Sequence, residues 1–311
     1  MRFIMSLAFA ALVAAGMLAA PGAAHANPNA IVNTEWLAGK LNDPKVRVVE
    51  VSVDPGLYER GHIPGAANVS WHTDLVDTVR RDIATRENFE KLASRLGIGP
   101  DTTVVLYGDH NNWFAAWGVW VFNTYGVVDV RLLDGGRKKW ELEKRELSTQ
   151  VPQIRATNFK VAKTESALRA RLNDVLAIAE GKQDGVLVDI LSPDEFSGKV
   201  FAPAGVQELA VRAGHVPGAK NVPWSQAVNQ ADGTLKSADE LRKLYAAAGI
   251  DGGKPVIVYC RIGERSSHTW FVLSLVLGYN NVQNYDGSWT EYGNTVGVPI
   301  TNVAGTVWGG K

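Results

Sequence analysis

Cys260 is the single cysteine in a chain of 311 residues, and its surroundings suit thiol chemistry. It follows the apolar run Val-Ile-Val-Tyr (256–259) and opens the segment Cys-Arg-Ile-Gly-Glu-Arg-Ser (260–266). A loop that turns into a helix N-terminus points backbone N–H groups inward, and the helix dipole adds positive potential. Such a loop favours the thiolate and binds an anion beside the sulfur. Arg261 and Arg265 add two positive charges, so the segment predicts a nucleophilic cysteine in an anion-binding loop.

The alternative for Cys260 is a buried, inert side chain flanked by two solvated arginines, which is the usual situation of a lone cysteine. We favour a functional thiol for two reasons. A smaller residue would suffice for packing, and the chain carries an export signal, described below, so an unused thiol would be at risk of oxidation.

The elements around Cys260 must bring it to the end of a buried strand. Short β-branched runs predict strands at 185–190, 255–259 and 282–285, and amphipathic segments predict helices at 238–248, with Ser237 as N-cap, and at 267–277. Ser-Trp-Thr-Glu (288–291) has the form of a capping box that opens another short helix. Alternating strands and helices predict an α/β fold with helices on both sides of a parallel sheet. In such sheets, sites form at the carboxyl ends of the strands, where Cys260 lies.

The chain also contains a long internal repeat. Gly-His-Ile-Pro-Gly-Ala (61–66) recurs as Gly-His-Val-Pro-Gly-Ala (214–219), 153 residues later. Val-Val-Leu-Tyr (104–107) matches 256–259, and Asp-Gly (134–135) matches Asp-Gly (286–287), both at an offset of 152. A constant period of this length indicates duplicated domains. At the position equivalent to Cys260, the first copy has Gly108, so we predict that the first domain is a structural, non-catalytic copy.

These motifs resemble those of the tandem-domain rhodanese family, the thiosulfate and 3-mercaptopyruvate sulfurtransferases. The resemblance covers nearly all of the chain after residue 26, and it rests on the paired Gly-His motifs, the loop 260–265 and Tyr-Asp-Gly-Ser-Trp (285–289). It implies two tandem rhodanese-like domains, each with a mostly parallel five-stranded sheet and helices on both faces. We place the N-terminal, non-catalytic domain at 27–150 and the C-terminal, catalytic domain at 151–311.

The resemblance further implies that Cys260 takes the sulfane sulfur of thiosulfate as a persulfide. The persulfide then passes the sulfur to a thiophilic acceptor, such as cyanide or a thiol, so kinetics should be ping-pong. Thiosulfate is favoured over 3-mercaptopyruvate because Arg261 and Arg265 suit an anionic donor and departing sulfite. The predicted substrate-binding residues are, besides these two arginines, Ile262, Gly263, Glu264, Ser266 and Arg212. Arg212 is included because it could supply the positive charge that relatives often carry on an arginine shortly after the residue equivalent to Asp189.

Other functions and ligands are less favoured. A Cys-based phosphatase or arsenate reductase uses Cys-x₅-Arg, whereas Cys260 to Arg265 is one residue shorter. A sulfur-carrier module, which would keep the persulfide without fast turnover, remains an alternative. Only the identity of the acceptor distinguishes such a carrier from an enzyme. The six histidines show no metal-binding spacing, and we predict neither a metal nor another cofactor.

The N-terminal 26 residues predict a secretory signal peptide. Met-Arg is followed by an Ala- and Leu-rich apolar run and by the small-x-small site Ala-His-Ala (24–26), so we expect a periplasmic or secreted protein. The run is near the lower limit for a membrane span, which leaves an uncleaved anchor as the alternative. With 32 Lys+Arg against 32 Asp+Glu, the composition gives no reason to expect nucleic acid or a membrane as partner of the mature chain. We expect a monomer that binds only a small sulfur donor and a thiophilic acceptor.

Overall fold

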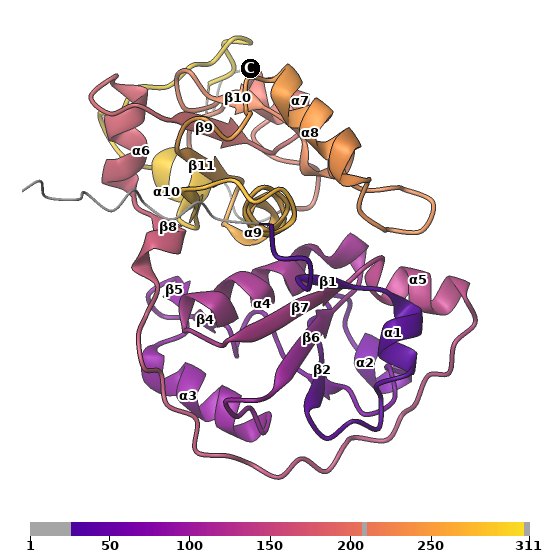
Figure 1. Ribbon diagram of the computed structural model, residues 1–311. Coiled ribbons are helices and arrows are strands. Elements are labelled where there is room, and N and C mark those ends of the chain that lie inside the picture. Colours follow the sequence, from indigo (N-terminus) through magenta and orange to yellow (C-terminus); the bar gives the residue numbers. More distant parts are fainter. Residues whose placement is uncertain (1–25, 207–209, 308–311) are drawn as a thin grey trace, which may run out of the picture.

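The computed structural model describes residues 26–206 and 210–307, which form two α/β halves stacked on one another (Figure 1). All but the last residue of the predicted signal peptide lies outside the described residues. Among the residues described, no helix has both the length and the apolar character needed to cross a membrane.

The first half begins with a short edge strand and ends with a helix that precedes the linker. Its elements are β1 (Ile31–Val32), α1 (Thr34–Ala38), β2 (Val46–Glu50), α2 (Leu57–Arg60), β3 (Ala67–Asn68), β4 (Val76–Asp77), β5 (Asp82–Ile83), α3 (Arg86–Arg95), β6 (Thr103–Tyr107), α4 (Trp113–Thr124), β7 (Asp129–Leu133) and α5 (Gly136–Leu142). A single 3₁₀ turn, His110–Asn112, leads into α4.

The second half repeats this order with small changes. Its elements are β8 (Arg169–Ala170), α6 (Leu172–Ala179), β9 (Val186–Asp189), α7 (Pro193–Phe196), β10 (Lys220–Asn221), α8 (Ala238–Ala247), β11 (Val256–Tyr259), α9 (Glu264–Phe271), β12 (Val282–Tyr285) and α10 (Ser288–Tyr292). The 3₁₀ turns Ser166–Leu168 and Trp224–Ala227 precede β8 and follow β10, and a π-helical turn, Val272–Val276, continues α9.

Each half contains a five-stranded sheet in which every neighbouring pair is parallel. The strand orders are β1-β7-β6-β2-β3 and β8-β12-β11-β9-β10, so the two sheets have the same topology. The register pairs Glu50 with Tyr107 in the first sheet and Asp189 with Tyr259 in the second. This confirms the predicted fold class and makes positions in the two halves directly comparable.

Helices cover both faces of each sheet because the central strands are apolar on both sides. All four residues of β11 are buried, and alternate side chains enter different cores: Val258 joins one cluster and Ile257 another. The largest cluster contains α4 residues of the first half and α9 residues of the second. These two helices contact each other between the sheets (Figure 1), so the two halves share one apolar core.

The predicted strands agree with the structure to within one or two residues, as do the starts of α8 and of the short helix α10, whereas the start of α9 does not. Helix α8 begins after Ser237, whose side chain accepts from Glu240 N as expected. The helix predicted from residue 267 begins instead at Glu264, after Gly263 at φ +97°. The capping box predicted at Ser288 is also wrong, because the Ser288 hydroxyl donates to the Tyr285 carbonyl, 2.7 Å away, and has no capping role.

An extended segment at about 149–165 connects the halves and runs along the outside of the first (Figure 1). Thr157 N donates to the Ser94 carbonyl at 3.0 Å, and Val161 N donates to a Glu90 carboxylate oxygen at 3.1 Å. This part of the linker is therefore packed against α3 before the chain reaches β8.

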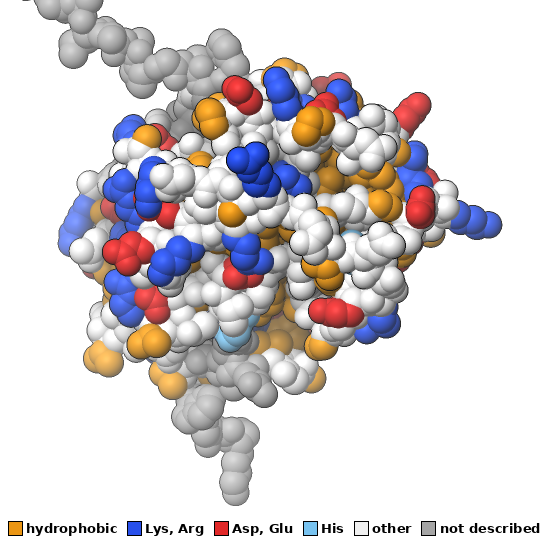
Figure 2. Space-filling view, turned by 90° about the horizontal axis from the view of Figure 1, so that it is seen from below, with side chains coloured by type: hydrophobic (Ala, Val, Ile, Leu, Met, Phe, Trp, Pro, Cys, Tyr) orange, Lys and Arg blue, Asp and Glu red, His pale blue; other side chains and the backbone are white. Residues whose placement is uncertain are grey.

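The molecular surface carries both signs of charge. On the face seen in Figure 2, Lys and Arg side chains are interspersed with Asp and Glu side chains. The pattern matches the even charge balance of the sequence.

Candidate active site

Cys260 lies at the carboxyl end of β11, in a loop held between two helices. Its Sγ is fully buried and accepts a hydrogen bond from the Gly263 backbone N–H at 3.1 Å. The Cys260 N–H donates to the Ser288 hydroxyl at 3.0 Å, and that hydroxyl lies 3.9 Å from Sγ. The Cys260 carbonyl accepts from Trp289 N at 3.0 Å. The start of α10 thus fixes the backbone at the cysteine, and the Gly263 N–H is placed to stabilise negative charge on the sulfur.

Glycine is required at position 263. A Cβ there would lie 2.5 Å from the Cα of Asp286, and φ is +97°. Only the absence of a side chain lets the loop turn into α9 while touching the Asp-Gly segment after β12. The predicted turn from the loop into a helix is therefore present, and it directs the Gly263 N–H to the sulfur.

Ser266 and Glu264 are buried beside the loop and do not line its outer side. The Ser266 hydroxyl lies 2.6 Å from Asn284 Oδ1 and 2.9 Å from the Gly263 carbonyl, so it braces the turn. Glu264 is 3% exposed, and one of its carboxylate oxygens has no hydrogen-bond partner. Burial, together with the nearby Cys260, raises the pKa of Glu264 well above its ordinary value. Burial therefore favours the uncharged, protonated form of this carboxyl.

Arg261 does not face a donor. Its guanidinium is 2% exposed, forms an ion pair with the equally buried Glu195, and donates to the Phe201 carbonyl at 3.1 Å. Glu195 is held in turn by its capping box with Ser192 at the start of α7. The expectation that Arg261 binds the anionic donor is corrected accordingly, because the charge it adds is compensated inside the protein.

Arg265 is the arginine of the loop that stays available. It is partly exposed, and its guanidinium lies over the ring of Trp113 from the first half, 5.3 Å from the ring centroid. No hydrogen bond or ion pair of its side chain is found among the described residues. Its charge acts on Asp189, at the end of β9. Arg265 therefore fits the predicted anion-binding role better than Arg261 does.

Arg212 is committed elsewhere, and its predicted substrate contact is corrected. Its guanidinium donates to four backbone carbonyls at and beyond the C-terminal end of α10. They belong to Tyr292, Gly293, Thr295 and Val298. Cys260 contacts the opposite end of that helix, at Ser288. Arg212 closes the helix C-terminus and brings no charge to the loop.

Asp189 is a residue of the site that the sequence did not single out as functional. It is fully buried at the end of β9, accepts from Leu191 N at 2.8 Å, and leaves its second carboxylate oxygen unpaired. Burial raises the pKa of Asp189 to about 7. The signal that could have found it is its place in a repeat, because the first half treats the equivalent position differently.

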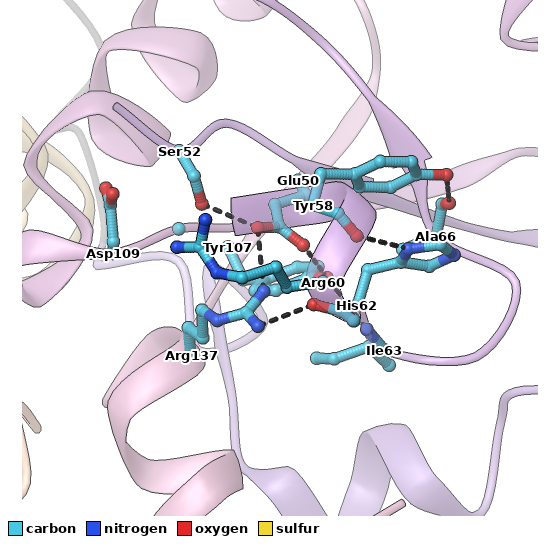
Figure 3. A network of polar contacts seen from close by, with 12 residues as sticks. Glu50, Ser52, Tyr58, Arg60, His62, Ile63, Ala66, Tyr107, Asp109 and Arg137 are labelled. Carbon is cyan, nitrogen blue, oxygen red and sulfur yellow. Dashed lines mark hydrogen bonds and ion pairs between the residues drawn. The ribbon is translucent and has the colours of Figure 1, made fainter. Parts of the chain in front are cut away.

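That equivalent position is Glu50, which belongs to a closed polar network (Figure 3). Arg137 donates to Glu50 at 3.0 Å, Ser52 donates to it at 2.7 Å, and the Tyr107 hydroxyl donates to its other oxygen. The second half has Trp289 at the position of Arg137, so Asp189 loses its buried arginine partner. The carboxylate of Glu50 thus has three side-chain donors, whereas that of Asp189 accepts one backbone N–H and has the Tyr259 hydroxyl as a neighbour.

The loop of the first half also has no room for a nucleophile. The Cβ of any larger residue at Gly108 would lie 2.2 Å from the Val51 carbonyl oxygen. Asp109, the next residue, accepts the N–H groups of Val53 and Asp54 at 2.9 Å. Together with His110 these two aspartates form the group of possible metal ligands found among the described residues, but the hydrogen bonds show Asp109 bracing the loop.

The two parallel sheets, together with the cysteine loop of the second half, define a tandem α/β protein whose candidate site is suited to thiol chemistry. The rhodanese-like domain family matches residues 33–143 and again residues 172–295. The chain belongs to the rhodanese family.

Relatives match along nearly their whole length. A protein of Saccharopolyspora erythraea named "Putative thiosulfate sulfurtransferase" is 55% identical over 88% of this chain and 96% of its own. "Sulfur carrier protein TtuD" of Thermus thermophilus is 54% identical over 89% of this chain and 98% of its own. The solved structure of the 3-mercaptopyruvate sulfurtransferase SseA from Escherichia coli has a TM-score of 0.72 at 27% identity, covering 84% of this chain and 99% of that one.

Proposed function

We propose that this protein is a thiosulfate sulfurtransferase with Cys260 as its nucleophile. The observation that carries the proposal is the loop itself, in which a backbone N–H lies 3.1 Å from a cysteine sulfur at the end of a buried strand. The names of relatives above 50% identity over most of the chain support thiosulfate as donor. Arg261, buried against Glu195, no longer supports thiosulfate over 3-mercaptopyruvate.

The reaction has two half-reactions. The Cys260 thiolate attacks the outer sulfur of thiosulfate, the bond between the two sulfurs breaks, and sulfite leaves with the bonding electrons. The persulfide carries the negative charge, which the Gly263 N–H stabilises. A thiophilic acceptor then attacks the outer sulfur and releases Cys260 as a thiolate. Arg265, partly exposed near the loop, would attract the donor and the departing sulfite.

The test is substitution of the nucleophile. Cys260→Ser should abolish both thiocyanate formation from thiosulfate and cyanide and the mass gain of one sulfur atom on incubation with thiosulfate alone. Ser is close in size, so the melting temperature should stay near that of the wild type. A variant that still turns over thiosulfate would disprove the assignment of Cys260.

A sulfur-carrier role is the second candidate, because a relative with 54% identity along nearly all of its length is named a sulfur carrier protein. The persulfide is common to both roles, so turnover separates them. A sulfurtransferase releases its sulfur rapidly to cyanide under excess donor. A carrier forms the persulfide stoichiometrically and discharges it slowly to small acceptors.

We also propose that the protein is exported after cleavage at residue 26 and is a monomer. The three-part pattern of residues 1–26 supports export. Large exposed apolar side chains such as Val79, Val128 and Val296 are scattered, which supports a monomer. N-terminal sequencing of protein from the cell envelope should find Asn27, and light scattering should give the mass of one chain. Met1 on membrane-bound protein would instead indicate an anchor.

A further inference from the structure

A cavity of about 340 Å³ lies between the two halves, next to the cysteine loop. The first half contributes the β4–β5 hairpin to its wall, and the second contributes β8 and the segment after β12. Four arginines line it, together with Ile262 of the loop: Arg80, Arg81, Arg169 and Arg171. A cavity of this size takes a small molecule of several functional groups, and thiosulfate would leave most of it empty.

Two of the four arginines are paired with acids. Arg169 bridges the halves, with Asp286 Oδ1 at 2.7 Å from its Nε and Asp82 of the hairpin on its Nη2. The Nε of Arg80 donates to Asp77 at 2.7 Å. These pairs compensate the charges of Arg169 and Arg80, so neither is the main source of positive potential in the cavity.

Arg81 and Arg171 are the two cations left over. Both are exposed residues, and in the described part of the chain neither side chain forms a hydrogen bond or an ion pair. Arg81 stands on the hairpin of the first half at φ +57°, and Arg171 follows β8 of the second. Two guanidinium groups with free donors, one from each half and both in the wall of one cavity, are suited to carboxylates, which they bind with two hydrogen bonds each.

The cavity lies beside the segments that hold the reactive sulfur, although Cys260 itself is not part of its wall. Its wall includes Gly287, which precedes the serine whose hydroxyl is 3.9 Å from Sγ. A second cavity of about 20 Å³ is lined by Ile262, Glu264 and Arg81, and leads from the same hairpin to the buried carboxyl beside Cys260. The charge of Arg81 acts on that carboxyl. A ligand held at Arg81 would therefore lie beside the loop without occupying the place of the donor.

We propose that Arg81 and Arg171 form an anion-binding site for the sulfur acceptor, and that this acceptor is a small thiol bearing carboxylates. The inference rests on the proposed sulfurtransferase function. The carboxylates bind the two arginines and the thiol reaches past Ile262 to the persulfide. The first half, which has no nucleophile, thereby contributes a residue to acceptor choice.

The transfer step balances without a further reactant. The acceptor thiolate attacks the outer sulfur of the Cys260 persulfide, forms a new S–S bond, and breaks the bond between that sulfur and Sγ. The products are the acceptor persulfide and the Cys260 thiolate, which takes up the proton that the acceptor thiol released. No electron is gained or lost overall, because one persulfide replaces another.

The test compares acceptors in the full-length protein. The KM for glutathione, which carries two carboxylates, should rise roughly 10-fold in Arg81→Ala and in Arg171→Ala, and further in the double variant. The KM for 2-mercaptoethanol, a neutral thiol, should change by less than about twofold at matched ionic strength. Arg155→Ala is the control, because Arg155 is an exposed linker arginine that lines neither cavity.

Each outcome has one meaning. If Arg81→Ala and Arg171→Ala leave the glutathione KM unchanged, or raise the KM for both thiols equally, the anion site is wrong. The proposed function is judged separately, by the mass gain of one sulfur atom on incubation with thiosulfate before any acceptor is added. Absence of that gain in the wild type would refute the sulfurtransferase itself. Rescue of glutathione use by Arg81→Lys would support a charge contact.

Discussion

Arg261 and Glu195 form a buried ion pair directly behind the reactive cysteine. Each side chain is at most 4% exposed, so neither charge is solvated by water. Removing one partner of such a pair leaves an uncompensated buried charge, which costs about 3–5 kcal/mol. The pair also ties the loop after β11 to α7, which lies about 65 residues earlier in the chain. At the scale of the residue, the Arg261–Glu195 ion pair therefore holds the cysteine loop in its conformation.

We therefore expect Arg261→Met, which keeps the length of the side chain, to lower stability and to reduce activity without changing donor preference. The kcat/KM for thiosulfate and for 3-mercaptopyruvate should fall by the same factor, and thermal unfolding should show a lower Tm. Glu195→Gln should have the same pattern. A selective loss with thiosulfate would show that the Arg261 charge acts on the donor after all.

Asp189 gives a prediction for pH. Its ordinary pKa is 3.8 and burial raises the pKa to about 7, so the folded protein holds a proton that the unfolded chain releases. A raised carboxyl pKa favours the folded state at low pH, and this contribution is lost as the pH rises from 3.8 to about 7. Asp189 therefore lowers the stability of the folded protein increasingly as the pH rises above 3.8, and its full cost is reached above about pH 7.

Asp189→Asn removes this titration and retains an oxygen for Leu191 N. The Tm of the variant relative to the wild type should increase from about pH 5 to about pH 8 because the wild type alone bears the cost of ionising the buried group. Glu264→Gln is a useful comparison, because burial raises the pKa of Glu264 in the same direction. A Tm difference between Asp189→Asn and wild type that does not depend on pH would contradict the raised pKa.

At the scale of the element, the loops that follow β6 and β11 differ in how much space they leave for a side chain. Gly108 lies against the Val51 carbonyl, whereas Cys260 fits beside Ser288. We expect Gly108→Cys to form no persulfide with thiosulfate and to lower the Tm. Gly108→Ala should lower the Tm comparably, because its Cβ meets the same oxygen at 2.2 Å. Sulfur incorporation at position 108, measured in a Cys260→Ser background, would contradict the view that this loop is closed.

The sequence predicted the elements around the site better than it predicted the partners of the arginines. Strand β11 was placed at 255–259, within one residue of Val256–Tyr259, because an apolar, β-branched run with clear ends signals a strand locally. The start of α9 was misplaced because Gly263, in a left-handed conformation, begins the helix at Glu264, three residues before the predicted start at 267. The partners of Arg261 and Arg212 could not be predicted, because they lie 60 or more residues away in the chain.

At the scale of the whole molecule, the two halves are joined by packing as well as by the linker. Trp117 of α4 is 2% exposed, stacks on Trp120 at 4.9 Å, and lines the small cavity that contains Glu264 of the other half. Arg169 connects Asp82 and Asp286 across the same boundary. The reactive loop is thus supported from both sheets, although all of its own residues come from the second.

This shared core predicts that the two halves unfold together. Calorimetry of the full chain should give one transition whose calorimetric and van't Hoff enthalpies agree, since neither half can keep the α4–α9 contact once the other has unfolded. Trp117→Ala should lower the Tm of that single transition, because loss of a buried tryptophan costs about 3–5 kcal/mol. Arg155→Ala serves again as the surface control. Two separable transitions, of which Trp117→Ala shifts only the first-half one, would show that the halves fold independently and that the contact between α4 and α9 contributes little to stability.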